Sequence, residues 1–313
     1  MTIIKGQSQT FLVYILFVNS PLFSVVIPTY NCKELLKKAI KSVLDQTYSN
    51  YEIIIIDNYS NDGTDIFVES LKNKKIKFVK NKNDGCIGRS RNVGIKLSQS
   101  KWVAFLDSDD IWFKNRLKAV FDILEIEGKE KFDVICNNEI FLKNEKKTLW
   151  KCGPKKGELY KSLIKYGNCI STSATVVKKD FLTKNKIFFS ENIEFSPYED
   201  FEFWMRIASS GGKFKFDNNA YGEHLFHSAS FSAQSGKARQ ESIISILRFH
   251  IFQVQNFTTK KDKLWLHVEN RLLLDQAVEL FISRRYLNSI FLFFKILLKY
   301  PITSIINILY KVK

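Results

Sequence analysis

The chain has 313 residues, of which 45% are hydrophobic, and its formal net charge is +16 at pH 7. This hydrophobic fraction excludes a disordered chain and is enough for one large domain, or for one domain with an appendage. The excess of lysine and arginine favours an anionic partner, such as nucleotide phosphates, nucleic acid or an anionic membrane. The five cysteines form no CxxC pair, which indicates free thiols in a reducing compartment and argues against a zinc site.

The N-terminal residues 1–22 contain the apolar run FLVYILFV at 11–18. The run is shorter than the ~20 residues that a spanning helix needs. It also lacks the basic start and the small-residue cleavage site of a signal peptide. We therefore expect residues 1–22 to form an extension that packs on the following domain or touches lipid.

From residue 23 apolar strands alternate with helical patterns. Strands are expected at 23–29, 51–57, 75–81 and 101–107, and helices are expected after Asn31 as cap, from Thr64 to Lys72, and over 88–99. Buried strands that alternate with helices imply a Rossmann-like α/β fold, in which helices cover both faces of a mostly parallel sheet.

The alternation continues with a helix at 115–127 and a strand at 132–141, and it weakens beyond residue 150. A further strand is expected within 170–179 and a helix over 199–209. We take residues 23–235 as one α/β domain.

Residues 236–313 form a predicted C-terminal helical region. In its last part Lys295, Lys299 and Pro301 interrupt the apolar run, so that no stretch reaches the ~20 residues of a spanning helix. Two short amphipathic helices with basic flanks are predicted to lie in the interface of an anionic membrane. The alternative is a helical pair that packs on the domain or on a second subunit of a homo-oligomer.

Three carboxylates, Asp107, Asp109 and Asp110, follow the predicted strand WVAFL. In an open α/β fold, ligands bind at the carboxyl ends of the strands. Neighbouring carboxylates repel each other unless a cation lies between them or one is protonated. Oxygen ligands suit Mg²⁺ or Mn²⁺, and such ions usually also bind substrate phosphates. The alternative is a solvated turn in which Asp109 or Asp110 caps the next helix.

Five segments occur in an order that resembles a known family. They are SVVIPTYN (24–31), IIIIDNYSNDGTD (53–65), NDGCIGRSRNVG (83–94), WVAFLDSDD (102–110) and EDFEFWMRIA (199–208). Together they resemble family 2 of the inverting glycosyltransferases, which has the GT-A fold. The resemblance implies a nucleotide-sugar donor, with a UDP-sugar expected, a divalent Mn²⁺ or Mg²⁺ cofactor, and transfer with inversion at the anomeric carbon.

The resemblance also implies roles for residues at the nucleoside end of the donor. Pro28 and Thr29 would line the uracil pocket, and Asp57 would accept hydrogen bonds from the nucleoside. Asn58 would also bind the donor, at a position where many relatives carry a second acid.

The resemblance places further residues near the diphosphate. Arg91 would face the diphosphate, Asp107 would contact ribose or metal-bound water, and Asp109 would bind the metal. His227 resembles a late metal-binding histidine of the family, with His224 as a rival and a structural histidine as the alternative.

The pair Glu199–Asp200 matches the acidic pair of the family, in which the Asp is the usual catalytic base. Asp200 would deprotonate the acceptor hydroxyl, and Glu199 is the second candidate. Trp204 follows on the same predicted helix, and we expect it to belong to the core rather than to the acceptor site.

Other classes fit less well. A dinucleotide-binding oxidoreductase should show G-x-G-x-x-G after the first strand, where this chain has PTYNCKE. No nucleic-acid partner is expected, since the lysines are spread along the chain and no nucleic-acid module is recognised. The alternative is a non-catalytic, membrane-associated protein that binds a nucleotide sugar.

We therefore expect a hexosyltransferase of cell-surface polysaccharide synthesis, such as O-antigen, capsule or lipooligosaccharide assembly. Its expected acceptor is a saccharide or glycolipid, and its expected location is cytoplasmic, peripheral on the inner face of the cell membrane.

Overall fold

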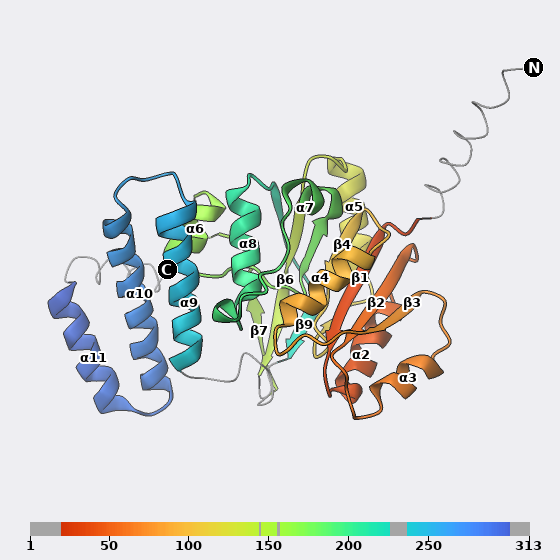
Figure 1. Cartoon of the computed structure of the whole chain (residues 1–313), viewed down its shortest axis with the longest axis horizontal. Helices are drawn as coiled ribbons and strands as arrows, with labels where there is room; N and C mark the ends of the chain where they lie inside the picture. The colour runs from red at the N-terminus through yellow and green to blue at the C-terminus, as the bar shows by residue number, and fades with distance from the viewer. Residues whose placement is uncertain (1–19, 144, 155–156, 226–236, 301–313) are drawn as a thin grey trace, which may run out of the picture. The chain divides into compact units, whose positions relative to one another are not determined.

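The computed structural model describes residues 20–143, 145–154, 157–225 and 237–300 (Figure 1). The chain divides into two compact units. Unit 1 contains residues 1–153 and 169–242, and unit 2 contains residues 154–168 and 243–313. The predicted domain boundary between residues 235 and 236 stays a prediction.

Unit 1 is built on one mixed sheet with the strand order β3-β2-β1-β4-β8-β6-β9-β5, and β7 pairs with β6. The strands are β1 (Phe23–Thr29), β2 (Tyr51–Asp57), β3 (Ile76–Lys80), β4 (Trp102–Phe105), β5 (Ile111–Trp112), β6 (Val134–Lys143), β7 (Lys146–Trp150), β8 (Thr175–Lys178) and β9 (Phe214–Leu225). The first four expected strands are therefore present.

The predicted parallel pairing holds for the first half of the sheet. Strand β1 pairs in parallel with both β2 and β4, and β2 pairs in parallel with β3. Beyond β4 the sheet is mixed, because β8 runs antiparallel to β4 and to β6, while β6 and β9 are parallel. Only the first half consists of the strand–helix–strand units that the sequence pattern predicts.

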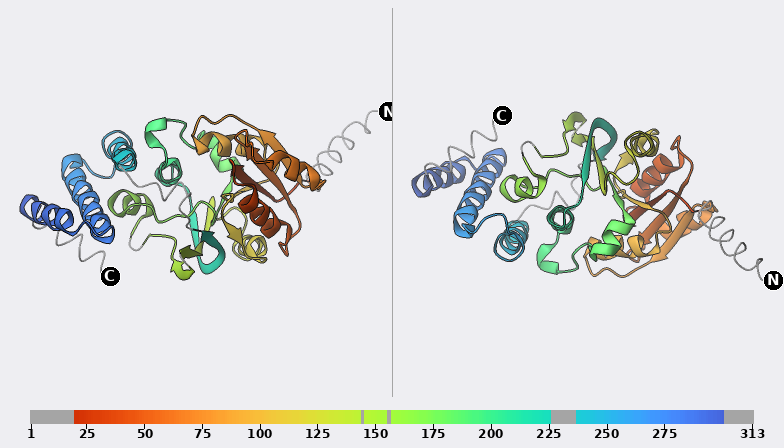
Figure 2. Two further views of the ribbon diagram at one scale, coloured as in Figure 1. Left: turned by 90° about the horizontal axis from the view of Figure 1, so that it is seen from below. Right: turned by 90° about the horizontal axis from the view of Figure 1, so that it is seen from above.

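Helices cover both faces of this sheet, as Figure 2 shows for α2 and α4 on opposite sides. One face carries α2 and α5, whose Leu36, Ile40 and Leu117 are fully buried in a core with β1 and β2. The other face carries α4, where the Gly94 backbone packs against Val26 of β1. The helices of unit 1 are α2 (Lys33–Leu44), α3 (Thr64–Ser70), α4 (Ile87–Leu97), α5 (Arg116–Glu127), α7 (Lys179–Asn185), the 3₁₀ helix η1 (Ile193–Phe195) and α8 (Glu199–Ser209).

The start of α2 differs from the prediction that Asn31 caps it. Asn31 adopts a left-handed φ of 46°, and its side-chain oxygen accepts a hydrogen bond from the Asn61 amide. The Lys33 amide at the first turn instead donates to the Asp62 carboxylate at 2.8 Å. Asp62 also accepts from Thr64, the residue expected to cap α3. One acid in the loop after β2 therefore satisfies the amino ends of both helices.

Unit 2 is helical. It contains α6 (Leu159–Tyr166), most of α9 (Lys237–Phe249), the π-helical turn η3 (His250–Val254), α10 (Lys261–Ile282) and α11 (Tyr286–Lys299). None of the helices described is both long and apolar enough to cross a membrane. Most of the expected extension at 1–22 and the second predicted C-terminal helix lie outside the described residues.

Candidate functional site

The parallel pairing of β1 with β2 and β4 brings three loops to one edge of the sheet. In the parallel ladder Thr29 at the end of β1 is paired with Asp57 at the end of β2, and Val26 is paired with Phe105 of β4. The segments that follow β1, β2 and β4 therefore leave the sheet on the same side. This edge is where open α/β folds bind ligands.

The expected nucleoside-binding residues lie at this edge and are held by their own loops. Asp57 is fully buried, and its carboxylate accepts hydrogen bonds from the Ser60 amide and hydroxyl. Asn58 accepts a hydrogen bond from the Asn83 amide at 2.9 Å, which links the loops after β2 and β3. Pro28 is buried within β1, and the Thr29 hydroxyl lies 3.2 Å from the Cys32 thiol.

A surface hollow adjoins these residues. Its volume is about 380 Å³, and it is lined by Tyr30, Asn58, Tyr59, Lys82 and Asp84. The side chains of Tyr30 and Tyr59 are 58% and 59% exposed, which is unusual for aromatic residues beside a buried strand end. Two open aromatic faces and a lysine fit a flat ring that carries phosphate. Of this lining only Asn58 was predicted from sequence, although both tyrosines stand inside the quoted segments.

The three carboxylates after β4 have different surroundings. Asp107 and Asp109 are partly exposed, whereas Asp110 is buried. The Ser173 hydroxyl accepts a hydrogen bond from the Asp107 amide and donates one to the Asp110 carboxylate at 2.5 Å. This serine therefore holds the turn from a segment 63 residues away in sequence, and no local pattern predicts its role.

Arg91 of α4 joins the end of β4 to the start of α8. Its guanidinium donates to Asp107 at 2.7 Å and to Glu199 at 3.0 Å, and Arg91 is only 4% exposed. Gly88, one turn earlier on α4, permits close packing here, because a Cβ there would lie 2.8 Å from the Ser190 carbonyl oxygen and 3.2 Å from Glu199 Cγ. Although burial alone would lower the pKa of Arg91, Asp107 and Glu199 raise it well above its ordinary value. The arginine therefore stays charged.

The two acids at the start of α8 lie in this buried ionic network. Burial raises the pKa of Glu199 to about 7, against the lowering effect of Arg91. Burial also raises the pKa of Asp200, which Arg91 again opposes, and its carboxylate accepts a hydrogen bond from Thr172 at 3.1 Å. A carboxylate whose pKa is raised toward neutrality is a better proton acceptor, as general-base chemistry requires. The expected core position of Trp204 on the same helix is confirmed, since it is fully buried.

Asp110 anchors the end of β9. Its carboxylate accepts a hydrogen bond from the Leu225 amide at 3.1 Å and lies 3.1 Å from His224 Nδ1. Burial alone would lower the pKa of His224, but Asp110 raises it to about 10, so that the pair is ionic at neutral pH. His224 is therefore a partner of Asp110, while His227 lies outside the described residues. The alternative in which Asp110 caps a helix is wrong, because α5 begins only at Arg116 with Asn115 before it.

The oxygen ligands at this edge fit a divalent ion that is shared with a phosphate. Within the described ranges, no group of three or more His, Cys, Asp or Glu side chains has the arrangement of a metal site. Mg²⁺, however, is commonly held by one or two carboxylates together with waters and substrate phosphates. Asp109 and Asp107, both partly exposed on one turn, provide such a partial set.

The structure thus brings together some of the predicted residues and separates others. Asp107 and Glu199 meet at Arg91, and Asp200 belongs to the same network. Pro28, Thr29, Asp57 and Asn58 form a second group at the ends of β1 and β2. Asp57 and Asp107 follow parallel strands that end on the same edge of the sheet, and the donor roles of both groups stay predictions.

Comparison with known proteins agrees with this layout. Residues 24–181 match the family model described as Glycosyl transferase family 2. One relative, named UDP-Glc:alpha-D-GlcNAc-diphosphoundecaprenol beta-1,3-glucosyltransferase WfaP from Escherichia coli, is 30% identical over 228 residues, which are 71% of this chain and 85% of that protein. A second E. coli protein with the same printed activity, WfgD, is 35% identical over 103 residues, covering 33% of this chain and 41% of that protein.

Two solved structures share the fold. S. aureus TarS 1-349 in complex with UDP-GlcNAc aligns with a TM-score of 0.63 and 22% identity, over 79% of this chain and 71% of that chain. The mannosyltransferase PcManGT from Pyrobaculum calidifontis, in complex with GDP-Man and Mn2+, aligns with a TM-score of 0.55 and 16% identity, over 82% of this chain and 71% of that chain. At these identities the likeness shows the fold alone.

Proposed function

We propose a reaction from the premise that this chain belongs to glycosyl transferase family 2 and is a glycosyltransferase. In the proposed reaction the enzyme moves a hexose from a UDP-sugar to a saccharide acceptor with inversion at the anomeric carbon. The observation that carries the proposal is the Arg91 bridge. It ties the acidic turn after β4 to the acids that begin α8, so that donor-side and acceptor-side groups have a fixed spacing.

The hollow at the ends of β1 and β2 is the proposed nucleoside site. Tyr30 and Tyr59 offer open ring faces to a base, and Lys82 offers a positive charge. Asp57 and Asn58 border the same loops and supply hydrogen-bond acceptors. Uracil is the proposed base because the printed names of WfaP and of the TarS complexes specify UDP-sugars or UDP.

Asp109, together with Asp107, is the proposed holder of Mn²⁺ or Mg²⁺. Such an ion, when bound, neutralises charge on the departing diphosphate. A neighbour of the same fold is described in complex with Mn2+, which supports the choice of metal. Arg91 is already engaged by two carboxylates, so that its proposed effect on the diphosphate is mainly to orient Asp107.

Asp200 is the proposed general base. Displacement at the anomeric carbon needs the acceptor hydroxyl to lose its proton as it attacks, and a positioned carboxylate contributes roughly 10²–10⁴ in rate. Burial raises the pKa of Asp200, and Thr172 and Arg91 hold its position and charge. Glu199, paired with Arg91 at 3.0 Å, is proposed to stabilise this arrangement and is the second candidate for the base.

The proposed acceptor is a lipid-linked saccharide used in cell-surface polysaccharide synthesis, at the inner face of the cell membrane. The printed names of two relatives specify a diphosphoundecaprenol-linked acceptor, which supports this choice. The helical unit with basic, apolar α11 supports a peripheral position at the membrane.

The test is a donor panel that includes UDP-glucose, UDP-GlcNAc and GDP-mannose, with MnCl₂ and a lipid-linked GlcNAc acceptor. Release of nucleotide and formation of a new glycolipid are measured together. We expect turnover with a UDP-sugar and loss of at least about a hundredfold in Asp200→Asn. Turnover with none of the donors, or equal turnover by the variant, would contradict the proposal.

A further inference from the structure

Helices α10 and α11 form an antiparallel hairpin with its own small core. Leu274 and Ala277 of α10 are buried against Ile296 of α11 and Tyr300. The Ser289 hydroxyl of α11 donates to the carbonyl of Ala277 at 2.7 Å. These contacts fix which side of α11 faces α10.

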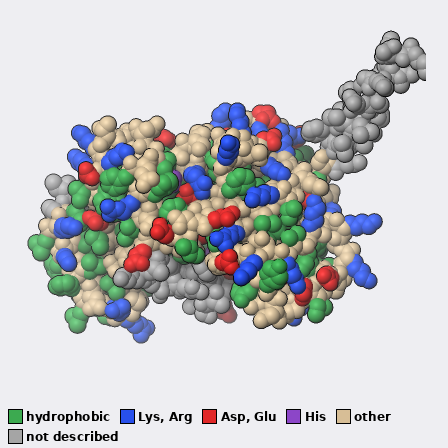
Figure 3. Space-filling view, in the orientation of Figure 1, with side chains coloured by type: hydrophobic (Ala, Val, Ile, Leu, Met, Phe, Trp, Pro, Cys, Tyr) green, Lys and Arg blue, Asp and Glu red, His purple; other side chains and the backbone are tan. Residues whose placement is uncertain are grey.

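The other side of α11 exposes large apolar side chains. Leu287, Phe291, Phe294 and Leu298 are 83%, 74%, 61% and 86% exposed. Their spacing of four, three and four residues places them on one stripe of the helix, which we call the α11 stripe. Hydrophobic side chains are seen over this region at the left of Figure 3. A stripe of this size normally marks an interaction surface.

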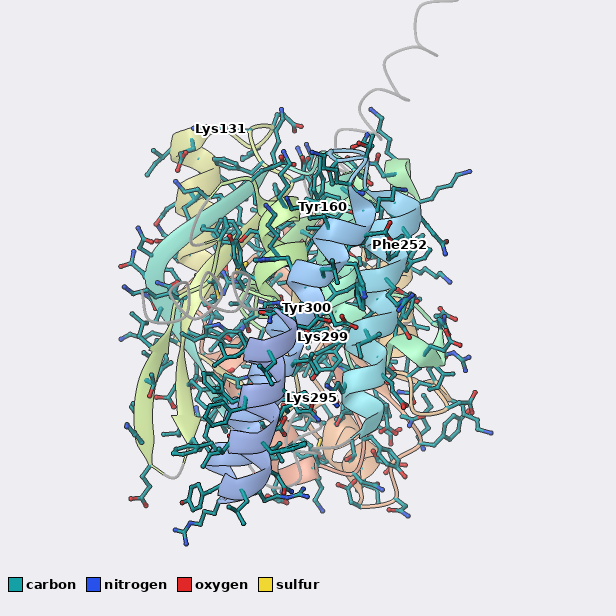
Figure 4. The ribbon with its side chains drawn as sticks, turned by 90° about the vertical axis from the view of Figure 1, so that its left-hand side faces the viewer. Lys131, Tyr160, Phe252, Lys295, Lys299 and Tyr300 are labelled. Carbon is teal, nitrogen blue, oxygen red and sulfur yellow. The ribbon has the colours of Figure 1, made fainter. Side chains whose placement is uncertain are left out.

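Basic residues border the α11 stripe. Arg284 and Arg285 precede the helix and are exposed, and Lys295 and Lys299 are exposed one turn apart along it (Figure 4). The sequence from Arg284 to Tyr300 contains no Asp or Glu. The surface is therefore apolar along the stripe and positive at its amino end and along one flank.

We propose that the α11 stripe docks on an anionic membrane leaflet, with the helix axis in the plane of the interface. An apolar stripe bordered by lysine and arginine matches an interface of acyl chains and negative headgroups. Its 14 residues span only about 21 Å, less than the ~30 Å hydrocarbon core, so that the helix lies on the bilayer. The inference deepens the proposed function, since it names the surface by which the enzyme would reach a lipid-linked acceptor.

A second copy of the chain fits this surface less well. In a symmetric dimer the same patch meets itself, so that the four basic side chains of one copy would approach those of the other. Lys299 lies 3.8 Å from Glu269 of α10, but the segment from Arg284 to Tyr300 contributes no acid of its own, so that basic side chains outnumber acids and the contact would be repulsive. A leaflet containing phosphatidylglycerol provides the complementary charge.

The test measures flotation of the full chain with lipid vesicles. The vesicles consist of phosphatidylcholine alone or of phosphatidylcholine with about 30% phosphatidylglycerol. The triple variant Leu287→Ser, Phe291→Ser, Leu298→Ser replaces three of the four apolar side chains of the α11 stripe. We expect its partition coefficient on anionic vesicles to fall at least about a hundredfold. The double variant Lys295→Gln, Lys299→Gln should lose about tenfold or more on anionic vesicles and little on neutral ones.

Matched controls make the same change elsewhere. Ile66, Ile126 and Ile193 are 73%, 81% and 65% exposed on unit 1, and their triple change to Ser should leave vesicle binding unaltered. All variants should keep the wild-type melting temperature, since only exposed side chains are changed.

The outcomes separate this inference from the proposed function. Transfer to a short water-soluble acceptor should be the same in the wild type and in the α11 variant. If the wild type transfers sugar from none of the donors, the proposed glycosyltransferase reaction is refuted, but the result on vesicle binding is not affected. Unchanged vesicle binding by the α11 variant overturns the docking proposal. The docking proposal is also overturned if light scattering shows a dimeric wild type and a monomeric variant, and the wild type does not bind vesicles. Vesicle binding that appears only after removal of residues 301–313 also overturns it, since the tail would then be the occupant.

Discussion

Replacing Arg91 with Met tests whether the bridge between β4 and α8 holds the site together. Arg91 is 4% exposed and contacts Asp107 at 2.7 Å and Glu199 at 3.0 Å. Removing one member of a buried ion pair leaves an uncompensated charge and typically costs about 3–5 kcal/mol. We therefore expect Arg91→Met to lower the free energy of unfolding by about 3–5 kcal/mol at pH 8, as measured by urea unfolding followed by circular dichroism.

The loss should depend on pH in a defined direction. Glu199 has a folded pKa of about 7, raised from 4.5, so that its protonation favours the folded state as pH falls through this range. Without Arg91 its pKa rises further, because Arg91 is the main group that lowers it. The destabilisation should accordingly be largest above pH 7 and should shrink toward pH 5, where Glu199 is neutral in the folded variant.

The matched control is Arg89→Met on the same helix. Arg89 is 37% exposed in its side chain and pairs with Asp84 at 2.7 Å, on the protein surface. Exposed pairs contribute ~0–1 kcal/mol, so that this variant should stay close to wild type. An Arg91→Met variant no less stable than the Arg89 control, or a loss independent of pH, would refute the reasoning.

Further predictions concern the base, the β9 anchor and the packing of α4. Asp200→Asn should leave UDP affinity intact while kcat falls at least about a hundredfold, and retained transfer would move the base elsewhere. In the wild type the acidic limb of the kcat–pH profile should lie above 3.8, because burial raises the pKa of Asp200, and a limb below 3.8 would argue against it. His224→Gln should cost about 3–5 kcal/mol of unfolding free energy at neutral pH. Asp110 raises the pKa of His224 from 6.5 to about 10, so that the cost of the substitution should disappear as pH rises through about 10. A cost that stays constant up to pH 11 would contradict the ion pair. Gly94→Ala should destabilise by about 1–3 kcal/mol in thermal melts, because its Cβ would lie 2.3 Å from Val26 Cγ1, and an unchanged melting temperature would contradict this close packing.

Local patterns were enough to predict the first half of the sheet and the location of the acids. A strand that helices cover on both faces is apolar along nearly its whole length, so that a run such as YEIIIID predicts a buried strand. Strand β2 is buried at every position. Acids that directly follow such strands must then lie at the carboxyl edge. For this reason Asp57 and Asp107 could be assigned to the edge from sequence.

Partners distant in sequence could not be predicted in this way. Arg91 and Glu199 are 108 residues apart, and His224 and Asp110 are 114 residues apart. Their pairing follows from how α4, α8 and β9 pack, which no local period encodes. Asn31 shows the same limit at short range, since a cap expected from its type was replaced by Asp62 from a neighbouring loop.

We propose that the acidic turn after β4 binds a divalent ion together with the diphosphate of a sugar nucleotide. Calorimetric titration of UDP with and without MnCl₂ measures this directly, with Asp109→Asn compared with the surface control Asp122→Asn, whose side chain is 43% exposed on α5. We predict that Mn²⁺ tightens UDP binding in the wild type and the control, and that Asp109→Asn loses this gain. An equal Mn²⁺-dependent gain in all three proteins would contradict metal binding by Asp109.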